Sequence, residues 1–196
     1  MASFQGTPSG FNWSYIQESE HQGVYDLYHN QVPYSKTHSL PPVAKDSPNV
    51  MELLENSRDF KIFTSFVKKS GLENVLRDPN RKVTLFAVPD SVFYKMPHHL
   101  WRELDHHDKR SIISFHLLPG LYAHNDFAGT RKFYRTEHPH ENLVVDGRGL
   151  TVRVGFRHHS ASVNPTVNYN AKITGPDNLA SNGIVHVINL PMIPYA

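Results

Sequence analysis

The sequence predicts an α+β fold, because helical patterns fill its first half and strand patterns its second. Apolar residues recur at helical spacing from about residue 47 to residue 116, and from Arg131 onward the period changes to two. Two short runs, Val83–Val88 and Ile184–Ile188, are rich in β-branched residues and show no regular polar alternation. Such runs are typical of strands buried on both faces of a sheet, so we expect them to be central strands.

Length and composition limit the class of protein. The 196 residues suffice for one domain with an extension, and 39% hydrophobic and 19% charged residues are typical of a globular chain. The 14 histidines would raise the formal charge from +2 to +16 (2 + 14) if all were protonated, so the charge depends on the acidity of the compartment. The absence of cysteine excludes disulfides and thiolate chemistry.

The chain divides into residues 1–46, an N-terminal extension, and residues 47–196, a single domain. The extension has no sustained periodicity but carries seven aromatic residues, so it is either a poorly ordered arm or a segment that packs across the domain. Its tripeptide Asn12-Trp13-Ser14 is a glycosylation sequon. No apolar run reaches the roughly 20 residues that span a bilayer, and the first residues do not resemble a signal peptide.

Start and stop residues define the expected helices. A first helix starts after Ser47, with Pro48 in its first turn, and a second runs from about Asp59 to a left-handed cap at Gly71. Asp90 is expected to cap a short helix of its own. A further helix is expected over residues 105–115.

In the second half, residues 143–145 and 150–156 are expected to form a hairpin around the turn at 146–149. Arg153 and Arg157 alternate with the apolar residues of the second strand, and His158 and His159 follow them. This pattern predicts a face that becomes more cationic in acid and suits an acidic polysaccharide or an anionic protein surface. The alternative is that these residues only solubilise the sheet.

Three segments carry a family resemblance. Thr84–Asp90 with Phe93 resembles the first signature box of the fasciclin domain, and Asn182–Asn189 resembles the second. Between them, Ile112–Tyr122 resembles the family's tyrosine-histidine box. The resemblance covers roughly residues 50–194 and implies N-terminal helices packed on a small β-sandwich.

The resemblance also suggests site residues. His116 matches the histidine of the box, which is linked to adhesion as well as to folding, so His116 is a candidate partner-binding residue. Phe115 replaces the tyrosine of the box, so a folding role is the safer inheritance for this pair. Asp177 and Asn178 stand where animal members carry an Asp-Ile pair associated with integrin recognition, and the alternative role of Asp177 is to cap a turn after Pro176. His186 lies within an apolar strand, so we expect a structural imidazole bonded to a backbone carbonyl or a neighbouring side chain.

No motif for a nucleophile, a phosphate loop or a zinc helix is present, so we expect no catalytic residue and no cofactor. The segment from Glu137 to Glu141 could gather two imidazoles and a carboxylate around a metal, but a solvated histidine-rich loop is the preferred interpretation. The preferred hypothesis is an extracellular or cell-surface adhesion or matrix-interaction module that is monomeric and binds protein or acidic polysaccharide rather than nucleic acid. The alternative is a partner-binding domain of the secretory or vacuolar lumen, and an enzyme built on the histidine loop is a third.

Overall fold

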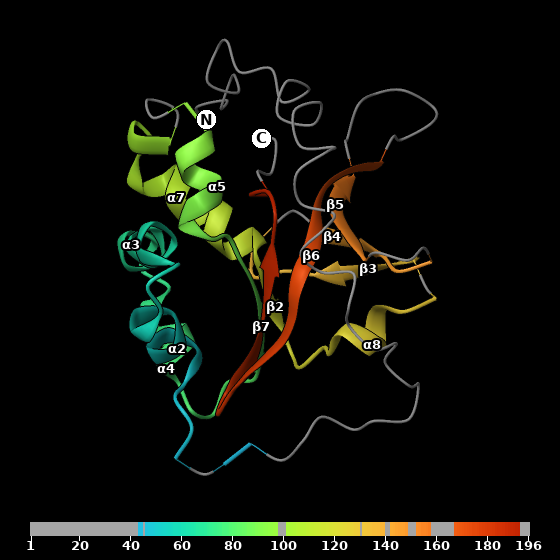
Figure 1. Cartoon of the computed structure of the whole chain (residues 1–196), viewed down its shortest axis with the longest axis horizontal. Coiled ribbons are helices and arrows are strands. Elements are labelled where there is room, and N and C mark those ends of the chain that lie inside the picture. The colour runs from blue at the N-terminus through green and yellow to red at the C-terminus, as the bar shows by residue number, and fades with distance from the viewer. Residues whose placement is uncertain are drawn as a thin grey trace.

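The computed structural model describes residues 43–44, 46–97, 101–129, 131–139, 142–148, 152–157 and 167–192. The helices are α2 (Val50–Asn56), α3 (Lys61–Ser70), α4 (Glu73–Arg77), α5 (Asp90–Lys95), α7 (His106–Phe115) and α8 (His124–Phe127). The strands are β1 (Val83–Ala87), β2 (Leu117–Pro119), β3 (Arg131–Arg135), β4 (Asn142–Asp146), β5 (Arg153–Arg157), β6 (Val167–Ala180) and β7 (Gly183–Ile188). The predicted α+β class is confirmed: helices α2 to α7 lie on one side of the strands, and α8 lies apart from them (Figure 1).

The strands form a seven-stranded sheet in the order β2-β1-β7-β6-β5-β4-β3. Strand β6 joins its two halves, because residues 167–172 pair with β5 and residues 173–180 pair with β7. The ring of Phe127 lies 6.2 Å from Phe86 of β1 and 5.4 Å from Tyr134 of β3. The two halves of the sheet therefore pack against the same aromatic cluster. This arrangement corresponds to the expected β-sandwich.

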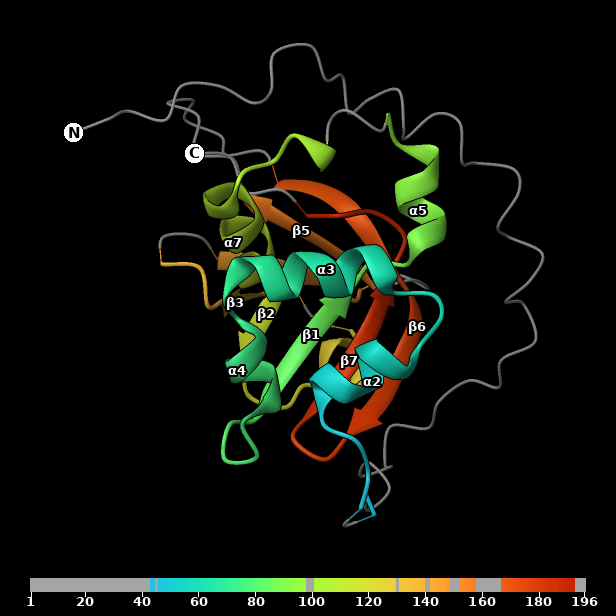
Figure 2. The same ribbon diagram turned by 90° about the vertical axis from the view of Figure 1, so that its left-hand side faces the viewer.

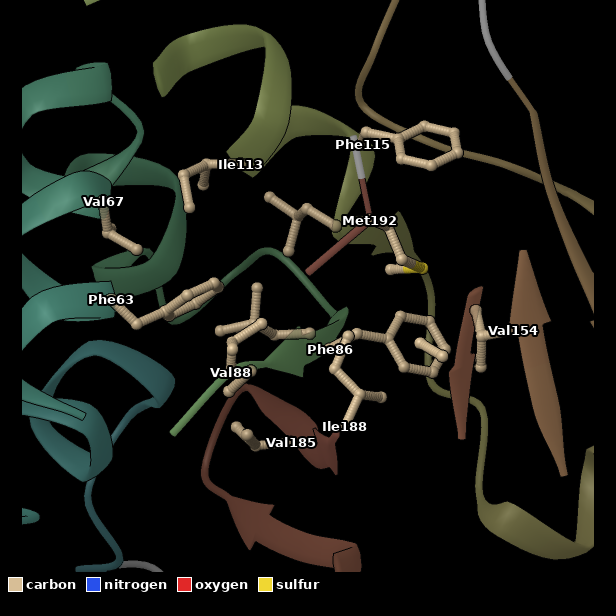
Figure 3. Close-up of a cluster of buried hydrophobic side chains, with 14 of the residues drawn as sticks. Phe63, Val67, Phe86, Val88, Ile113, Phe115, Val154, Val185, Ile188 and Met192 are labelled. Atoms are coloured by element: carbon tan, nitrogen blue, oxygen red, sulfur yellow. The ribbon is translucent and has the colours of Figure 1, made fainter. Parts of the chain in front are cut away.

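The two apolar runs form the central strands, as predicted. Strands β1 and β7 pair in parallel, with Val83 opposite Gly183 and Ala87 opposite Val187 (Figure 2). All five residues of β1 are buried, and in β7 only Val187 is partly exposed. Figure 3 shows how side chains of both strands meet those of α3 and α7, with Phe63, Phe86 and Ile113 in one cluster.

Two predicted caps are wrong. The first helix begins at Val50, and its cap is Asn49, whose side chain and that of Glu52 accept hydrogen bonds from each other's backbone N–H. Asp90 does not cap its own helix, because its carboxylate accepts hydrogen bonds from the N–H groups of Lys61 and Ile62. It therefore caps α3, which has no side-chain cap of its own. The predicted left-handed cap at Gly71 (φ 74°) and the helix after Asp105 are confirmed.

One buried amide joins the helices to the end of β6. The side chain of Asn182 accepts a hydrogen bond of 2.8 Å from the N–H of Val50 and donates to the carbonyl oxygens of Leu76 and Asp78. One side chain thus provides hydrogen-bond partners for a backbone N–H at the start of α2 and for backbone carbonyls at the end of α4. The second signature box therefore begins with a residue that orients two helices.

The expected hairpin is also present, since β4 and β5 pair antiparallel with Asp146 opposite Arg153. Of the proposed extension, residues 1–42 and 45 lie outside the described residues, and with them the sequon at Asn12. No described helix is long and apolar enough to cross a membrane.

Candidate functional site

His116 closes helix α7 and is completely buried. Its Nδ1 lies 2.8 Å from the carbonyl oxygen of Ile112, and its Nε2 accepts a hydrogen bond of 3.0 Å from the N–H of Met192. These partners require the neutral imidazole with its proton on Nδ1. Burial lowers the pKa of His116 to about 4, and the hydrogen bond to Ile112 opposes this effect.

The burial of His116 corrects its expected place on a partner surface, because none of its surface is accessible in this conformation. Its contacts instead tie the end of α7 to the segment that follows β7. Phe115 is also fully buried, with its ring 6.4 Å from that of His138. A tyrosine here would need a partner for its hydroxyl in the core, whereas phenylalanine needs none.

His186 is the second completely buried imidazole. Its Nε2 lies 2.8 Å from the carbonyl oxygen of Tyr122, and its Nδ1 accepts a hydrogen bond of 3.2 Å from the N–H of Asp177. The expected carbonyl partner is thus Tyr122, and the proton sits on Nε2. Burial lowers the pKa of His186, while the bond to Tyr122 and the charge of Asp177 oppose that shift.

Asp177 and Asn178 form a corner within β6, at an irregularity in its pairing with β7. Asp177 has a φ of 55°, in the left-handed region, and its Oδ1 accepts a hydrogen bond of 2.8 Å from the N–H of His124. The expectation that it caps a turn after Pro176 is therefore wrong, since it caps helix α8 instead. Asn178 is exposed, and its Nδ2 donates to the carbonyl oxygens of Gly175 and Val185.

The sequence analysis missed Tyr122 and His124, which surround this corner. The pKa of His124 is lowered by burial, although the nearby Asp177 carboxylate raises it. No local pattern could reveal this arrangement, because His124 and Asp177 are 53 positions apart. The corner is thus a hydrogen-bonded bend that presents Asn178 to solvent and ties the Asp177 carboxylate to helix α8.

Arg153 and Arg157 are the first and last residues of β5, and only their backbone positions are described. In the register, Arg153 lies opposite Asp146 of β4 and Lys172 of β6, and Asp146 lies opposite Arg131 of β3. Arg148 covers Asp146 with hydrogen bonds of 2.9 and 2.7 Å. Directly opposed residues share a face of a sheet. We call the positions of Arg131, Asp146, Arg148, Arg153 and Lys172, together with Arg157 at the other end of β5, the cationic row.

The histidine loop does not form a metal site within the described structure. Glu137 pairs with Arg81 at 2.8 Å, and His138 lies 3.1 Å from the hydroxyl of Ser111. His140 and Glu141 lie outside the described residues. Among the residues that are described, no three His, Asp or Glu side chains are placed to hold a metal ion.

Comparison with known proteins identifies the family. The model of the fasciclin domain matches residues 58–194, which is more than half of the chain. The chain belongs to the fasciclin family. Fasciclin domains occur in extracellular and cell-surface proteins, are commonly adhesion-related and are generally non-catalytic.

Two relatives illustrate the match to the fasciclin domain. The fasciclin-like arabinogalactan protein 12 of Arabidopsis thaliana is 25% identical over 137 residues, covering 64% of this chain and 55% of that protein. The chain therefore spans about half the length of this relative. A solved FAS1 domain pair from the insect cell adhesion molecule fasciclin I has a TM-score of 0.56 and 20% identity, over 75% of this chain and 51% of that one. The latter likeness shows the fold.

The structure explains why the two signature boxes recur together in a fasciclin domain. The first box forms β1 and the second forms β7, and these strands are partners at the centre of the sheet. The histidine box lies at the end of α7, where the chain returns as β2 to pair with the other edge of β1. All three boxes thus build one structural unit, and the sequence motifs alone place no partner on it.

Proposed function

We propose that this fasciclin domain is a non-catalytic adhesion or matrix-interaction module that binds an acidic partner, either a polysaccharide or a protein, through the cationic row. The observation that supports the proposal is the alignment of three basic residues, Arg131, Arg153 and Lys172, across neighbouring strands with one carboxylate, that of Asp146. That carboxylate is 2% exposed and is covered by Arg148, whose side chain is 57% exposed. At this point of the row, the guanidinium of Arg148 therefore faces solvent and the carboxylate of Asp146 does not.

Fasciclin domains occur in extracellular and cell-surface proteins, so we propose the same setting for this domain. A role in the secretory or vacuolar lumen would use the same surface in a more acidic medium. His158 and His159 follow Arg157 in the sequence and would add charge below about pH 6.5. Binding is therefore expected to strengthen in acid and to weaken as salt screens the attraction.

The test is binding of the full chain to an acidic and a neutral polysaccharide at about pH 5 and about pH 7.5, at low and high salt. The Arg153→Ala/Arg157→Ala double variant is expected to weaken binding to the acidic polymer by roughly two- to thirtyfold, since each exposed ion pair contributes about 0.2–1 kcal/mol. Arg58→Ala, which removes an exposed basic residue on the helical side, is the matched control. If binding does not change with salt and pH, or is unchanged in the double variant, the cationic row is not the binding surface.

The corner at Asp177 and Asn178 is the second surface that we propose, because Asn178 is exposed there. Asn178→Ala removes two hydrogen bonds that hold the bend, so it tests the corner without altering charge. If Asn178→Ala abolishes binding of a protein partner while the cationic row is intact, the partner binds at the corner and not at the row.

A further inference from the structure

A groove between α3, α5 and the segment leading into α7 contains an unusual set of side chains. It encloses about 270 Å³, close to the lower end of small-molecule sites, which run from about 300 Å³. Figure 2 shows α3, α5 and α7 together on the helical side of the molecule. Its lining combines basic and aromatic residues, among them Lys61, Lys69, Tyr94, Trp101, Arg102 and Lys109.

Lys109 is the most informative of these residues, since it is only 8% exposed. Its Nζ lies 5.7 Å from the centre of the Phe66 ring, and within the described part of the chain its ammonium has no hydrogen-bond acceptor or ion-pair partner. Burial lowers the pKa of Lys109, and the charge of Lys69 lowers it further. A buried ammonium without a partner is unfavourable, so an anion in the groove would stabilise it.

The acidic residues near the groove are already engaged. Asp90 lines it, but its carboxylate accepts the two N–H groups at the start of α3. Asp105 and Asp108 attract Lys109, but their carboxylates accept each other's backbone N–H in the capping box of α7. The groove therefore has more basic side chains than acidic side chains that could pair with them.

The aromatic walls add a second requirement to the ligand. Tyr94 is 64% exposed, and Trp101 is stacked beneath the guanidinium of Arg102 at 5.4 Å from the ring centre. Exposed aromatic rings supply flat, rigid and largely apolar contact area. A ligand for this groove must join an anionic group to a compact body with an apolar face.

We propose that the groove is a binding site for a carboxylated sugar unit of an acidic oligosaccharide. The carboxylate would lie near Lys69 and Lys109, and the C–H face of the pyranose ring would lie against Tyr94 or Trp101. An acidic peptide fits less well, because helices wall the groove and offer no strand edge for the peptide backbone to pair with. This site goes beyond the proposed function, since it lies on the helices and the cationic row lies on β3 to β6.

The experiment titrates the full chain with an oligouronate and, separately, with its methyl ester, which has the same body without the charge. A Trp13→Phe background leaves Trp101 as the only tryptophan, so its fluorescence reports on the groove itself. We expect saturable oligouronate binding with a change in Trp101 emission and at least about tenfold weaker binding of the ester.

Two variants test the residues. Lys69→Met/Arg102→Met alters only exposed side chains, and Lys109→Met keeps the packing on Phe66 while removing the charge. Both variants are expected to reduce the affinity for the oligouronate at least about fivefold. The control is Lys68→Met, because Lys68 directly precedes Lys69 in α3 but is paired with Glu55. It should change the affinity less than about twofold. Urea unfolding of each variant checks that it folds.

The Arg153→Ala/Arg157→Ala variant separates this inference from the proposed function, because it should leave the Trp101 signal and the groove affinity unchanged. Equal binding of acid and ester, or full affinity in the Lys69→Met/Arg102→Met variant, would overturn the proposal. Polyglutamate that binds the groove as tightly as the oligouronate would overturn the assignment of a sugar.

Discussion

The buried, neutral state of His116 predicts that acid unfolds this domain through a specific residue. Above the unfolded pKa of about 6.5 the imidazole is neutral in both states, and its contribution to stability is fully present. As the pH falls below that value the unfolded chain binds a proton that the folded chain cannot, so the free energy of unfolding decreases. The difference between about 6.5 and the folded pKa of about 4 corresponds to about 3 kcal/mol, lost in full as pH falls through the folded value.

The measurement is urea unfolding between about pH 7.5 and pH 4, comparing the wild type with His116→Asn. An asparagine does not titrate, and its amide N–H can approach the carbonyl of Ile112, so the variant should be less stable at neutral pH but less sensitive to acid. The difference between the two proteins should shrink toward pH 4. His186 is unchanged in both, so its titration cancels. His106→Asn, at the exposed start of the same helix, is the control. Parallel stability curves for wild type and His116→Asn would refute the reasoning.

Three further predictions concern stability. His186→Ala should lower the free energy of unfolding at neutral pH by about 3–5 kcal/mol, since it leaves two buried backbone groups without partners; an unchanged melting temperature would contradict this. Asp90→Ala should cost about 1–2 kcal/mol through the lost cap of α3, whereas Ser91→Ala, next to it and exposed, should cost little in the same urea titration. Deletion of residues 1–42 should leave cooperative unfolding intact, and loss of the folded state would place the extension in the core.

The elements that the sequence predicted correctly are those whose cause is local. The apolar runs of β1 and β7, the left-handed glycine after α3 and the helix α7 each depend on residues within a few positions of one another. Such signals can be interpreted without knowing how the chain folds. The same holds for the hairpin of β4 and β5.

The features that the sequence did not predict depend on partners far along the chain. Asp90 caps a helix that begins 29 residues before it, and Asp177 holds the N–H of a residue 53 positions away. His116 was expected on a surface because its motif resembles one associated with adhesion, but its burial depends on Met192, 76 positions later. The basic groove was missed for the same reason, since its lysines come from α3 and α7, Tyr94 comes from α5 and Trp101 comes from the segment before α7.

The pairing of β1 with β7 has a consequence for how the domain is made. The hydrogen bond from the N–H of Val50 to the side chain of Asn182 joins residues 132 positions apart, and β1 has no partner on that edge until the second box exists. During synthesis the helices and β1 leave the ribosome long before β7, so the edge of β1 that pairs with β7 stays unpaired until then. Contacts of such long sequence separation slow folding, because the chain must close large loops before they stabilise it. A nascent chain halted before residue 183 should therefore remain open to chaperones and proteases, and the addition of residues 183–188 should convert it to the protected state in a single step.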